Sequence, residues 1–407
     1  MADIVLKGNT SGSITITSPD VSGVNVLTLP VETGTILTTN TPLPEVSSVE
    51  FAGAGTSSGN ITITAPDTDE TNTLTFPETT GTFATENSLG MRNLIINGNM
   101  AIDQRNAGSV FTITADDQYG LDRWVGRTYG GAGRFSMQQV TDAPEGFLKS
   151  TKITVTTTAN SGAGGYAIEQ RIEGNNLTNL KYGSSEAKII TKSFWIKASI
   201  AGTYTASLRT SDPSGNISSC VNTFTISVAN TWEYKTVTYP ANTAFTMKTD
   251  NGVALFFDIN FGAQTSKSTN TLGSWQSGNF VFNSAQVDLL QTSGATINIT
   301  GVQLETGTVA TPFENLQYGQ QLSLCQRYYE VVITNDSNGF YGTPGSGAVG
   351  YSNYFYQTTK RAAPTVVLGA GGTLPTLQVS GQSGFSSYAP AGVYPRINGG
   401  TTITSEL

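Results

Sequence analysis

Residues 301–330 read GVQLETGTVATPFENLQYGQQLSLCQRYYE, and this stretch joins the end of one domain to the start of another. Just before it, Ile297 and Ile299 alternate with polar residues, and the alternation resumes after a one-residue slip at Gly301. A period of two is typical of a half-buried strand, and a slip at a glycine indicates a β-bulge. We therefore expect a bulged strand that closes a sandwich.

The second half of this stretch changes pattern at Thr311 and Pro312, because proline cannot continue a regular ladder. Leu322 and Cys325 then follow at near-helical spacing, and residues 327–333 return to strand-forming types. The stretch predicts a strand, a break, a short helix and a second strand.

Three segments of the chain resemble the tail-fibre proteins of phages, especially phages of marine bacteria. They are QLETGTVATPFE with YGQQLSLCQRYYE, RNLIINGNMAIDQRNAG with YGLDRW, and KSFWIKASIAGTYTASLR. Together they cover the chain from about residue 90 to residue 330. The resemblance implies a virion fibre with a jelly-roll domain of the carbohydrate-binding-module kind.

The composition indicates an all-β protein with an uncharged polar surface. Only 12% of the residues are charged, against about 25% in typical soluble proteins, and threonine and glycine are abundant. No long stretch shows an apolar period of 3.6 residues. Threonine-rich alternation with many glycines favours strands joined by tight turns.

The charge balance argues against nucleic-acid and membrane partners. The net charge is −8 and the pI is near 4.7, so no basic stripe is present to neutralise phosphates. The first residues, MADIVLKGNT, lack the apolar core of a signal peptide, and no apolar run is long enough to span a bilayer. We expect neither signal-directed export nor membrane insertion.

The cysteines, Cys220 and Cys325, lie far apart in sequence and form no disulfide framework. We expect both to be buried thiols. A β-protein without disulfides fits assembly in the reducing cytoplasm of a host cell, followed by release on a particle.

The N-terminal region is a tandem repeat. Residues 11–40 align without a gap to residues 58–87, at an offset of 47 (58 − 11). Each copy is too small to enclose a core, so it must bury apolar faces against another chain or, alternatively, pack as a hairpin on the neighbouring domain. Similar repeats occur in the N-terminal shafts of phage fibres, where three chains intertwine. We therefore predict a homotrimer, with residues 1–45 and 46–90 as repeats that attach it to other virion tail proteins.

Two further domains are expected after the repeats. Residues 91–318 show strand after strand separated by turn residues, which predicts a jelly-roll β-sandwich. Residues 319–407 are rich in glycine and tyrosine and predict a small distal β-domain, the tip of the fibre. The strand-like runs of the central domain are FTIT, RFSMQQV, KITVTTT, YAIEQRI, SFWIKA, TYTASLR, NTFTISV, EYKTVTYP, VALFFDINF, NFVFNSAQVDLL and ATINITGVQLE.

Catalytic machinery is sparse in this sequence. There is no histidine, which removes histidine-based triads, and no phosphate-binding glycine motif. A depolymerase could still use paired carboxylates, and the clusters to consider are Asp116, Asp117 and Asp122, and Glu169 with Glu173. The simpler interpretation is a polar turn, an ion pair between Asp122 and Arg123 or Arg127, and solvated glutamates. Asp116 and Asp117 could also hold a structural Ca²⁺, although no EF-hand spacing supports it. We expect no catalytic residue, no metal and no cofactor.

Sugar binding needs exposed aromatic rings among uncharged hydrogen-bonding groups. Trp275 lies in a Gly/Ser-rich loop, where it either contacts a sugar or folds back onto the sandwich. Trp124 and Trp195 lie in apolar strands and are expected in the core, whereas Trp232 is ambiguous. The remaining candidates are tyrosines of the distal domain that lie among Gly, Ser and Asn: Tyr341, Tyr351, Tyr354, Tyr388 and Tyr394.

These observations favour a homotrimeric tail fibre that attaches to host cells by non-covalent recognition of surface polysaccharide or lipopolysaccharide. The alternative is a structural virion subunit, such as a head fibre, decoration or adaptor protein, that does not bind a receptor.

Overall fold

The computed structural model describes residues 4–7, 13–16, 48–52, 60–64, 91–160, 162–332, 340–341, 350–367, 369, 376–389, 396–397 and 400–407. The chain divides into two units, residues 1–82 and residues 83–407.

The first unit contains two hairpins. Strand β1 (Ile4–Lys7) pairs antiparallel with β2 (Ser13–Ile16), and β3 (Ser48–Ala52) pairs antiparallel with β4 (Asn60–Thr64). The ITIT strand predicted in each repeat is therefore present, and its partner precedes it in the chain. The predicted LTLP and LTFP strands lie outside the described residues.

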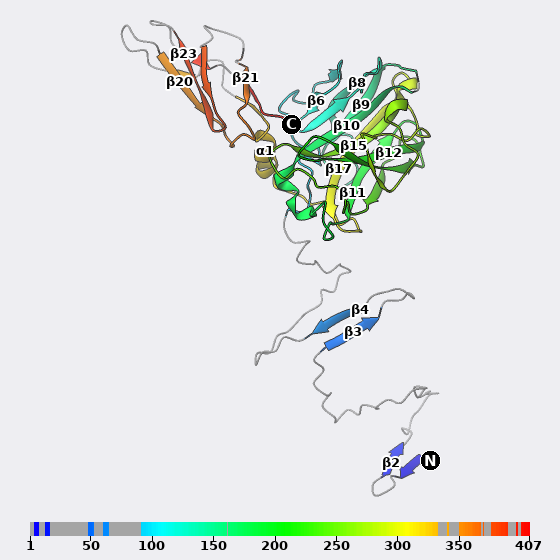
Figure 1. Ribbon diagram of the computed structural model, residues 1–407. Helices are drawn as coiled ribbons and strands as arrows, with labels where there is room; N and C mark the ends of the chain where they lie inside the picture. Colours follow the sequence, from blue (N-terminus) through cyan, green and yellow to red (C-terminus); the bar gives the residue numbers. More distant parts are fainter. Residues whose placement is uncertain are drawn as a thin grey trace, which may run out of the picture. The chain divides into compact units, whose positions relative to one another are not determined.

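The second unit is dominated by two antiparallel sheets that face each other, and both can be followed in Figure 1. The seven-stranded sheet runs in the order β16 (Trp275–Ser277), β13 (Ile217–Ile226), β12 (Gly202–Ser211), β15 (Val253–Gln264), β10 (Ala163–Glu173), β7 (Trp124–Arg127), β6 (Gln118–Leu121). The six-stranded sheet runs in the order β14 (Glu233–Tyr239), β11 (Ile190–Ala198), β17 (Thr296–Thr306), β9 (Ser150–Thr157), β8 (Arg134–Val140), β5 (Phe111–Ile113). This is the predicted all-β, jelly-roll type of sandwich.

The core lies between the two sheets because alternate residues of each strand point inward. On β11, Phe194 and Ile196 are buried, and on β15, Phe257 and Phe261 are buried. Each fully buried aromatic or aliphatic side chain of this size contributes about 1.5–3 kcal/mol relative to exposure. The short 3₁₀ helices at the sandwich periphery are Gly174–Asn176, Thr178–Leu180, Thr265–Lys267 and Leu289–Gln291.

The predicted bulge at Gly301 is confirmed. The register between β11 and β17 shifts opposite this residue, and Gly301 has φ of +61°, in the left-handed region that favours glycine. A Cβ atom placed at Gly301 would lie 2.6 Å from the ring of Phe147, so a larger residue clashes as well as being strained.

The strand predicted over NFVFNSAQVDLL does not form. Phe282 makes only an isolated bridge with Ser268, and Asn283 turns the chain because its side chain accepts a hydrogen bond from the amide of Ala285. An asparagine that bonds to the backbone two residues ahead favours a turn over a strand. Strands β6, β7 and β16, in contrast, were not predicted.

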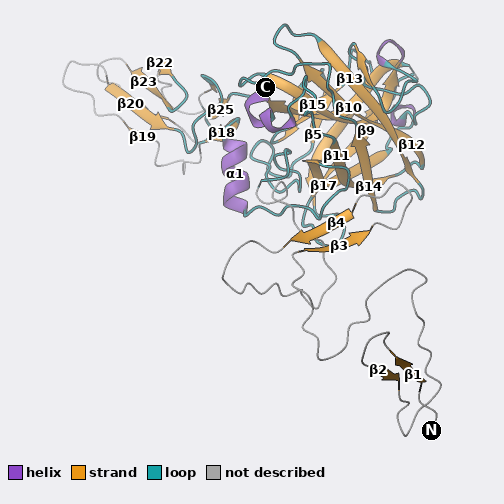
Figure 2. Ribbon diagram, turned by 60° about the horizontal axis from the view of Figure 1, so that its bottom comes forward, coloured by secondary structure: helices purple, strands orange, loops and turns teal. Residues whose placement is uncertain are grey.

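The distal residues form α1 and three small sheets, which Figure 2 shows by secondary structure. The helix is α1 (Tyr318–Gln326), capped at its start by reciprocal bonds between Gln317 and Gln320, and it is followed by β18 (Tyr329–Val331) as predicted. The sheets are β18–β25 (Thr402–Thr404)–β21 (Thr365–Val367), β19 (Phe340–Tyr341)–β24 (Arg396–Ile397), and β20 (Gly350–Phe355)–β23 (Gly384–Ala389)–β22 (Thr376–Ser380).

Residues 401–407 strap the distal region to the sandwich. Strand β25 is the middle strand of its sheet, and Glu406, which follows it, pairs with Arg105 at 2.6 Å and with Arg123. The Arg123 guanidinium is buried and lies 3.6 Å over the ring of Tyr328. The strap therefore places two arginines of the sandwich against a carboxylate and an aromatic ring of the distal region.

One lysine lies inside the core. The Lys192 ammonium donates hydrogen bonds to the carbonyl oxygens of Ser207 at 2.9 Å and Asp258 at 2.8 Å, and lies 3.8 Å over the ring of Phe257. Burial lowers the pKa of Lys192 to about 7. A side chain of the six-stranded sheet thus ties two strands of the opposite sheet together through the core.

Replacing Glu406 with alanine is expected to destabilise the protein. The free energy of unfolding should fall by about 3–5 kcal/mol, because Arg123 is left buried without its carboxylate. Urea unfolding of the full chain measures the change. As a control, Glu186→Ala at an exposed turn should cost less than about 0.5 kcal/mol. Equal effects of the two substitutions would contradict a role for the strap.

Replacing Lys192 with methionine is expected to remove a pH-dependent component of stability. Unfolded Lys192 keeps its proton up to its ordinary pKa of 10.5, whereas the folded residue loses it from about 7, so its destabilising effect is full below pH 7 and is relieved as the pH rises. The difference in urea midpoint between Lys192→Met and wild type should therefore shrink as the pH rises from about 7 toward 10.5. A difference that stays constant over this range would contradict this assignment.

Candidate functional site

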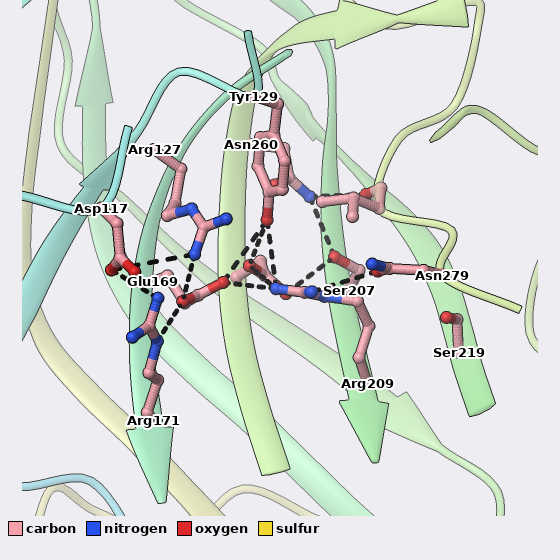
Figure 3. A network of polar contacts seen from close by, with 12 residues as sticks. Asp117, Arg127, Tyr129, Glu169, Arg171, Ser207, Arg209, Ser219, Asn260 and Asn279 are labelled. Atoms are coloured by element: carbon pink, nitrogen blue, oxygen red, sulfur yellow. Dashed lines mark hydrogen bonds and ion pairs between the residues drawn. The ribbon is translucent and has the colours of Figure 1, made fainter. Parts of the chain in front are cut away.

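The outer face of the seven-stranded sheet carries a network of charged side chains, which Figure 3 shows from close by. The charged residues point away from the core because they alternate with core residues: on β10, Ile168 and Ile172 are in the core, and Glu169 and Arg171 lie on the outer face. The partners come from neighbouring strands: Arg127 from β7, Arg209 from β12 and Asp258 from β15.

Glu169 is the centre of this network. It is fully buried and pairs with Arg171 at 2.7 Å, with Arg127 at 3.2 Å and with Arg209. Arg209 also pairs with Asp258 at 2.9 Å. The expectation that Glu169 and Glu173 are solvated was wrong, because both are buried, and Glu173 pairs with Arg327 at 2.8 Å.

The electrostatics set the protonation of the two central carboxylates. Burial alone would raise the pKa of Glu169, but the guanidiniums of Arg209, Arg127 and Arg171 lower it to about 2. Burial raises the pKa of Asp258, although Arg209 opposes the shift. Glu169 is therefore ionised at neutral pH and cannot serve as the proton donor that glycoside hydrolysis requires.

Loops cover one side of this network. The ring of Tyr129 packs edge-on against Phe282 at 5.4 Å, and its hydroxyl lies 3.4 Å from Glu169. Asn260 donates to the carbonyl of Val281 at 2.8 Å. The outer face of the seven-stranded sheet, which we call the polar face, thus holds these loops in place. The centre of the polar face is therefore not open to a large ligand.

The acidic residues at the edge of the network also have partners. Asp116 accepts from Arg127 Nη2 at 3.2 Å, and Asp117 accepts from Arg171 at 2.5 Å. Asp122 does not pair with Arg123 or Arg127 as expected; it accepts from the amide and the side chain of Gln104.

The outer face of the six-stranded sheet carries partly exposed aromatic rings. Tyr234 of β14 lies opposite Trp195 of β11, with ring centroids 5.4 Å apart. Phe147 lies over Gly301 beside Trp195, and its ring is 5.2 Å from that of Phe313. We call Tyr234, Trp195, Phe147 and Phe313 the aromatic row.

Trp195 belongs to this row and not to the core. Its neighbours Phe194 and Ile196 are fully buried, whereas Trp195 is partly exposed and Tyr234 is 43% exposed. The expectation of a core Trp195 was wrong, because the strand alternation turns it outward. The alternation of SFWIKA itself was the signal that could have shown this.

Polar groups flank the row. Two residues along β11 from Trp195, Lys197 pairs with Asp142 and lies 5.2 Å over the ring of Trp232. The Trp232 indole donates to Asp142 at 3.3 Å. At the other end, Phe313 also lines an apolar cavity of about 260 Å³ together with Leu316 and other residues.

Trp275, for which the sequence left open a sugar contact or packing on the sandwich, folds back onto the sandwich. Its ring is partly buried, packs edge-on against Tyr182 at 5.7 Å, and its indole donates to the carbonyl of Pro240 at 2.7 Å. Trp124 is fully buried as expected, and both cysteines are free, buried thiols.

The predicted tyrosines are placed differently from one another. Tyr354 is buried, and its hydroxyl donates to Glu330 at 2.7 Å, so its ring is part of the small distal core. Tyr351 and Tyr388 are paired positions of β20 and β23, and Tyr341 lies on β19. Tyr394 lies outside the described residues. Ligand contact by these residues stays a prediction.

Within the described ranges, no group of three or more Cys, Asp or Glu side chains is arranged to hold a metal ion. The helices of those ranges are too short or too polar to cross a bilayer.

We compared the chain with known proteins, and the matches are to solved structures that are similar in fold. No family model and no curated protein matches the chain. Among solved structures, the enzymatically active domain of tailspike protein 4 of bacteriophage CBA120 matches 53% of this chain at 16% identity and a TM-score of 0.28, and the match spans 21% of the tailspike chain.

Carbohydrate-binding modules are also similar. The xylan-binding domain of Paenibacillus barcinonensis Xyn10C aligns over 99% of its length with 50% of this chain, at 12% identity and a TM-score of 0.26. A family 61 module in complex with β-1,4-galactotriose aligns over its full length with 53% of this chain, at 10% identity and a TM-score of 0.27. Similarities this low carry no argument about function.

Replacing Glu169 with glutamine is expected to lower the free energy of unfolding by about 3–5 kcal/mol at neutral pH, because the buried guanidiniums of Arg171 and Arg209 and the partly buried one of Arg127 lose a charged partner. The stability that Glu169 contributes is present above its ordinary pKa of 4.5 and is lost as the pH falls toward 2. Urea unfolding should therefore show that the difference in free energy of unfolding between wild type and Glu169→Gln shrinks as the pH falls across this range. A difference that does not depend on pH would contradict the ionised assignment, and the exposed Glu145→Gln provides the control.

Proposed function

We propose that this chain is the subunit of a homotrimeric virion tail fibre that attaches to host cells by non-covalent recognition of surface glycan, without turnover. The observation that carries the proposal is the aromatic row. Partly exposed rings on a sheet face, with uncharged hydrogen-bonding residues beside them, supply what the faces of sugar rings bind.

The surroundings of the row support this assignment. Thr236 and Thr238 are exposed on the same strand and face as Tyr234, so hydroxyl groups lie next to the rings. Each aromatic contact of this kind is worth on the order of 1 kcal/mol beyond burial, so a single site would be weak. Three linked copies would raise the avidity by roughly 10²- to 10⁴-fold.

The assignment to a fibre rests on sequence features outside the row. The tandem repeats of residues 1–90 and the resemblance of the segments between residues 90 and 330 to phage tail fibres support it. The mass of the full chain in solution tests the trimer, and a monomeric mass would contradict it.

Absence of turnover is supported by the chemistry of the polar face. Of the two fully buried carboxylates there, Glu169 is held ionised by arginines and cannot donate a proton at neutral pH, and Asp258 is paired with Arg209. Release of reducing ends from host polysaccharide, abolished by Glu169→Gln or Asp117→Asn, would contradict this part of the proposal.

Removing rings from the row is expected to weaken attachment. Labelled full-length protein should bind host cells, and Trp195→Ala and Tyr234→Ala should each weaken binding by about tenfold, which corresponds to about 1.4 kcal/mol. Tyr234 is 43% exposed, so its substitution tests binding without loss of a core contact.

The matched control is Phe355→Ala, since Phe355 is a 77% exposed ring on the distal β20. Wild-type binding by both row variants would contradict the role of the row, and a loss confined to Phe355→Ala would place the receptor site on the distal region.

A further inference from the structure

The aromatic row crosses strands and does not follow one. Tyr234 and Trp195 are paired positions on β14 and β11, and Phe147 lies over Gly301 of β17, the next strand. Adjacent strands are about 4.8 Å apart, so the rings extend across roughly 10–15 Å of the sheet. The aromatic row is therefore longer than one sugar ring and suits a chain of several linked sugar units.

The charges beside the row are balanced. Lys197 is paired with Asp142, and Trp232 donates to the same carboxylate. Lys149 and Glu145 lie on the loop that carries Phe147, and Glu314 follows Phe313. Basic and acidic side chains therefore occur together near the rings, so the row is not surrounded by charge of one sign.

We infer that the aromatic row binds an extended, uncharged glycan laid across β14, β11 and β17, with several sugar units in contact at once. This inference rests on the proposed glycan recognition and narrows it to one class of ligand. Acidic polysaccharides are disfavoured, because Lys197 is already paired with Asp142, and Asp142 and Glu145 would repel a polyanion.

A second copy of the chain is the competing occupant. Leu148 is 87% exposed beside Phe147 and would be buried in such an interface. The hydroxyls and the charged pair around the row favour a polar ligand, because the centres of protein interfaces are depleted of charged groups.

The test measures binding of full-length protein to xylo- and cello-oligosaccharides from the disaccharide to the hexasaccharide, and to the polymers xylan, mixed-linkage β-glucan, alginate and polygalacturonate. The neutral polymers should bind, affinity should rise about tenfold from disaccharide to hexasaccharide, and added salt should not weaken it. Trp195→Ala and Tyr234→Ala should weaken binding about tenfold, whereas Tyr234→Phe, which keeps the ring, and Phe355→Ala should bind as wild type.

Several results would overturn the inference: binding to the acidic polymers only, weakening by salt, equal affinity for short and long oligosaccharides, or no binding to any of these probes. A change of mass in solution in Trp195→Ala with unchanged glycan binding would instead assign the row to an interface between copies. Host-cell binding measured on the same samples separates failure of this inference from failure of the proposed function. If wild-type protein binds cells but does not bind neutral glycans as expected, only this inference fails. If wild-type protein binds neither the cells nor the glycans, the proposed function fails as well.

Discussion

The left-handed backbone at Gly301 is the constraint on which the sandwich and its aromatic face both depend. Strand β17 lies between β11 and β9, and the extra residue at Gly301 shifts its register with β11, so that Ile297 and Ile299 before it and Val302 and Leu304 after it all point into the core. Without that slip, one half of the strand would turn its apolar residues to solvent. The missing side chain also leaves the room into which Phe147 and Trp195 converge.

The same alternation of inward and outward residues gives the two outer faces of the sandwich different side chains. On the seven-stranded sheet, outward residues are charged and form a closed network under loops, so this face supplies rigidity. On the six-stranded sheet, the outward rings of Trp195 and Tyr234 remain partly exposed. A rigid, satisfied face behind a more open one is a suitable support for weak, repeated contacts, because little conformational freedom is lost on binding.

Many elements of the fold could be predicted from the sequence because they are determined by neighbouring residues. The period-two runs, the bulge at Gly301 and the helix after Pro312 were found where they were expected. The ion network could not be predicted, because Glu169, Arg209 and Asp258 come from three strands whose order is set by topology. Trp195 was misplaced for a simpler reason: its apolar neighbours suggested a core residue, but the pleat turns it outward. For Trp275 the sequence left a sugar contact and packing on the sandwich open, and a long-range bond to Pro240 shows the packing.

The strap formed by residues 401–407 supplies the middle strand of the first distal sheet and the carboxylate that pairs with Arg123. During synthesis, β18 and β21 emerge before the strand that must lie between them, and Arg123 waits for Glu406 across a sequence separation of 283 residues. Contacts of such high sequence separation form late and slowly. Without this segment, Arg123 would lack its carboxylate and β18 and β21 would lack the strand between them, so a partly folded chain would be open to proteolysis until the segment docks.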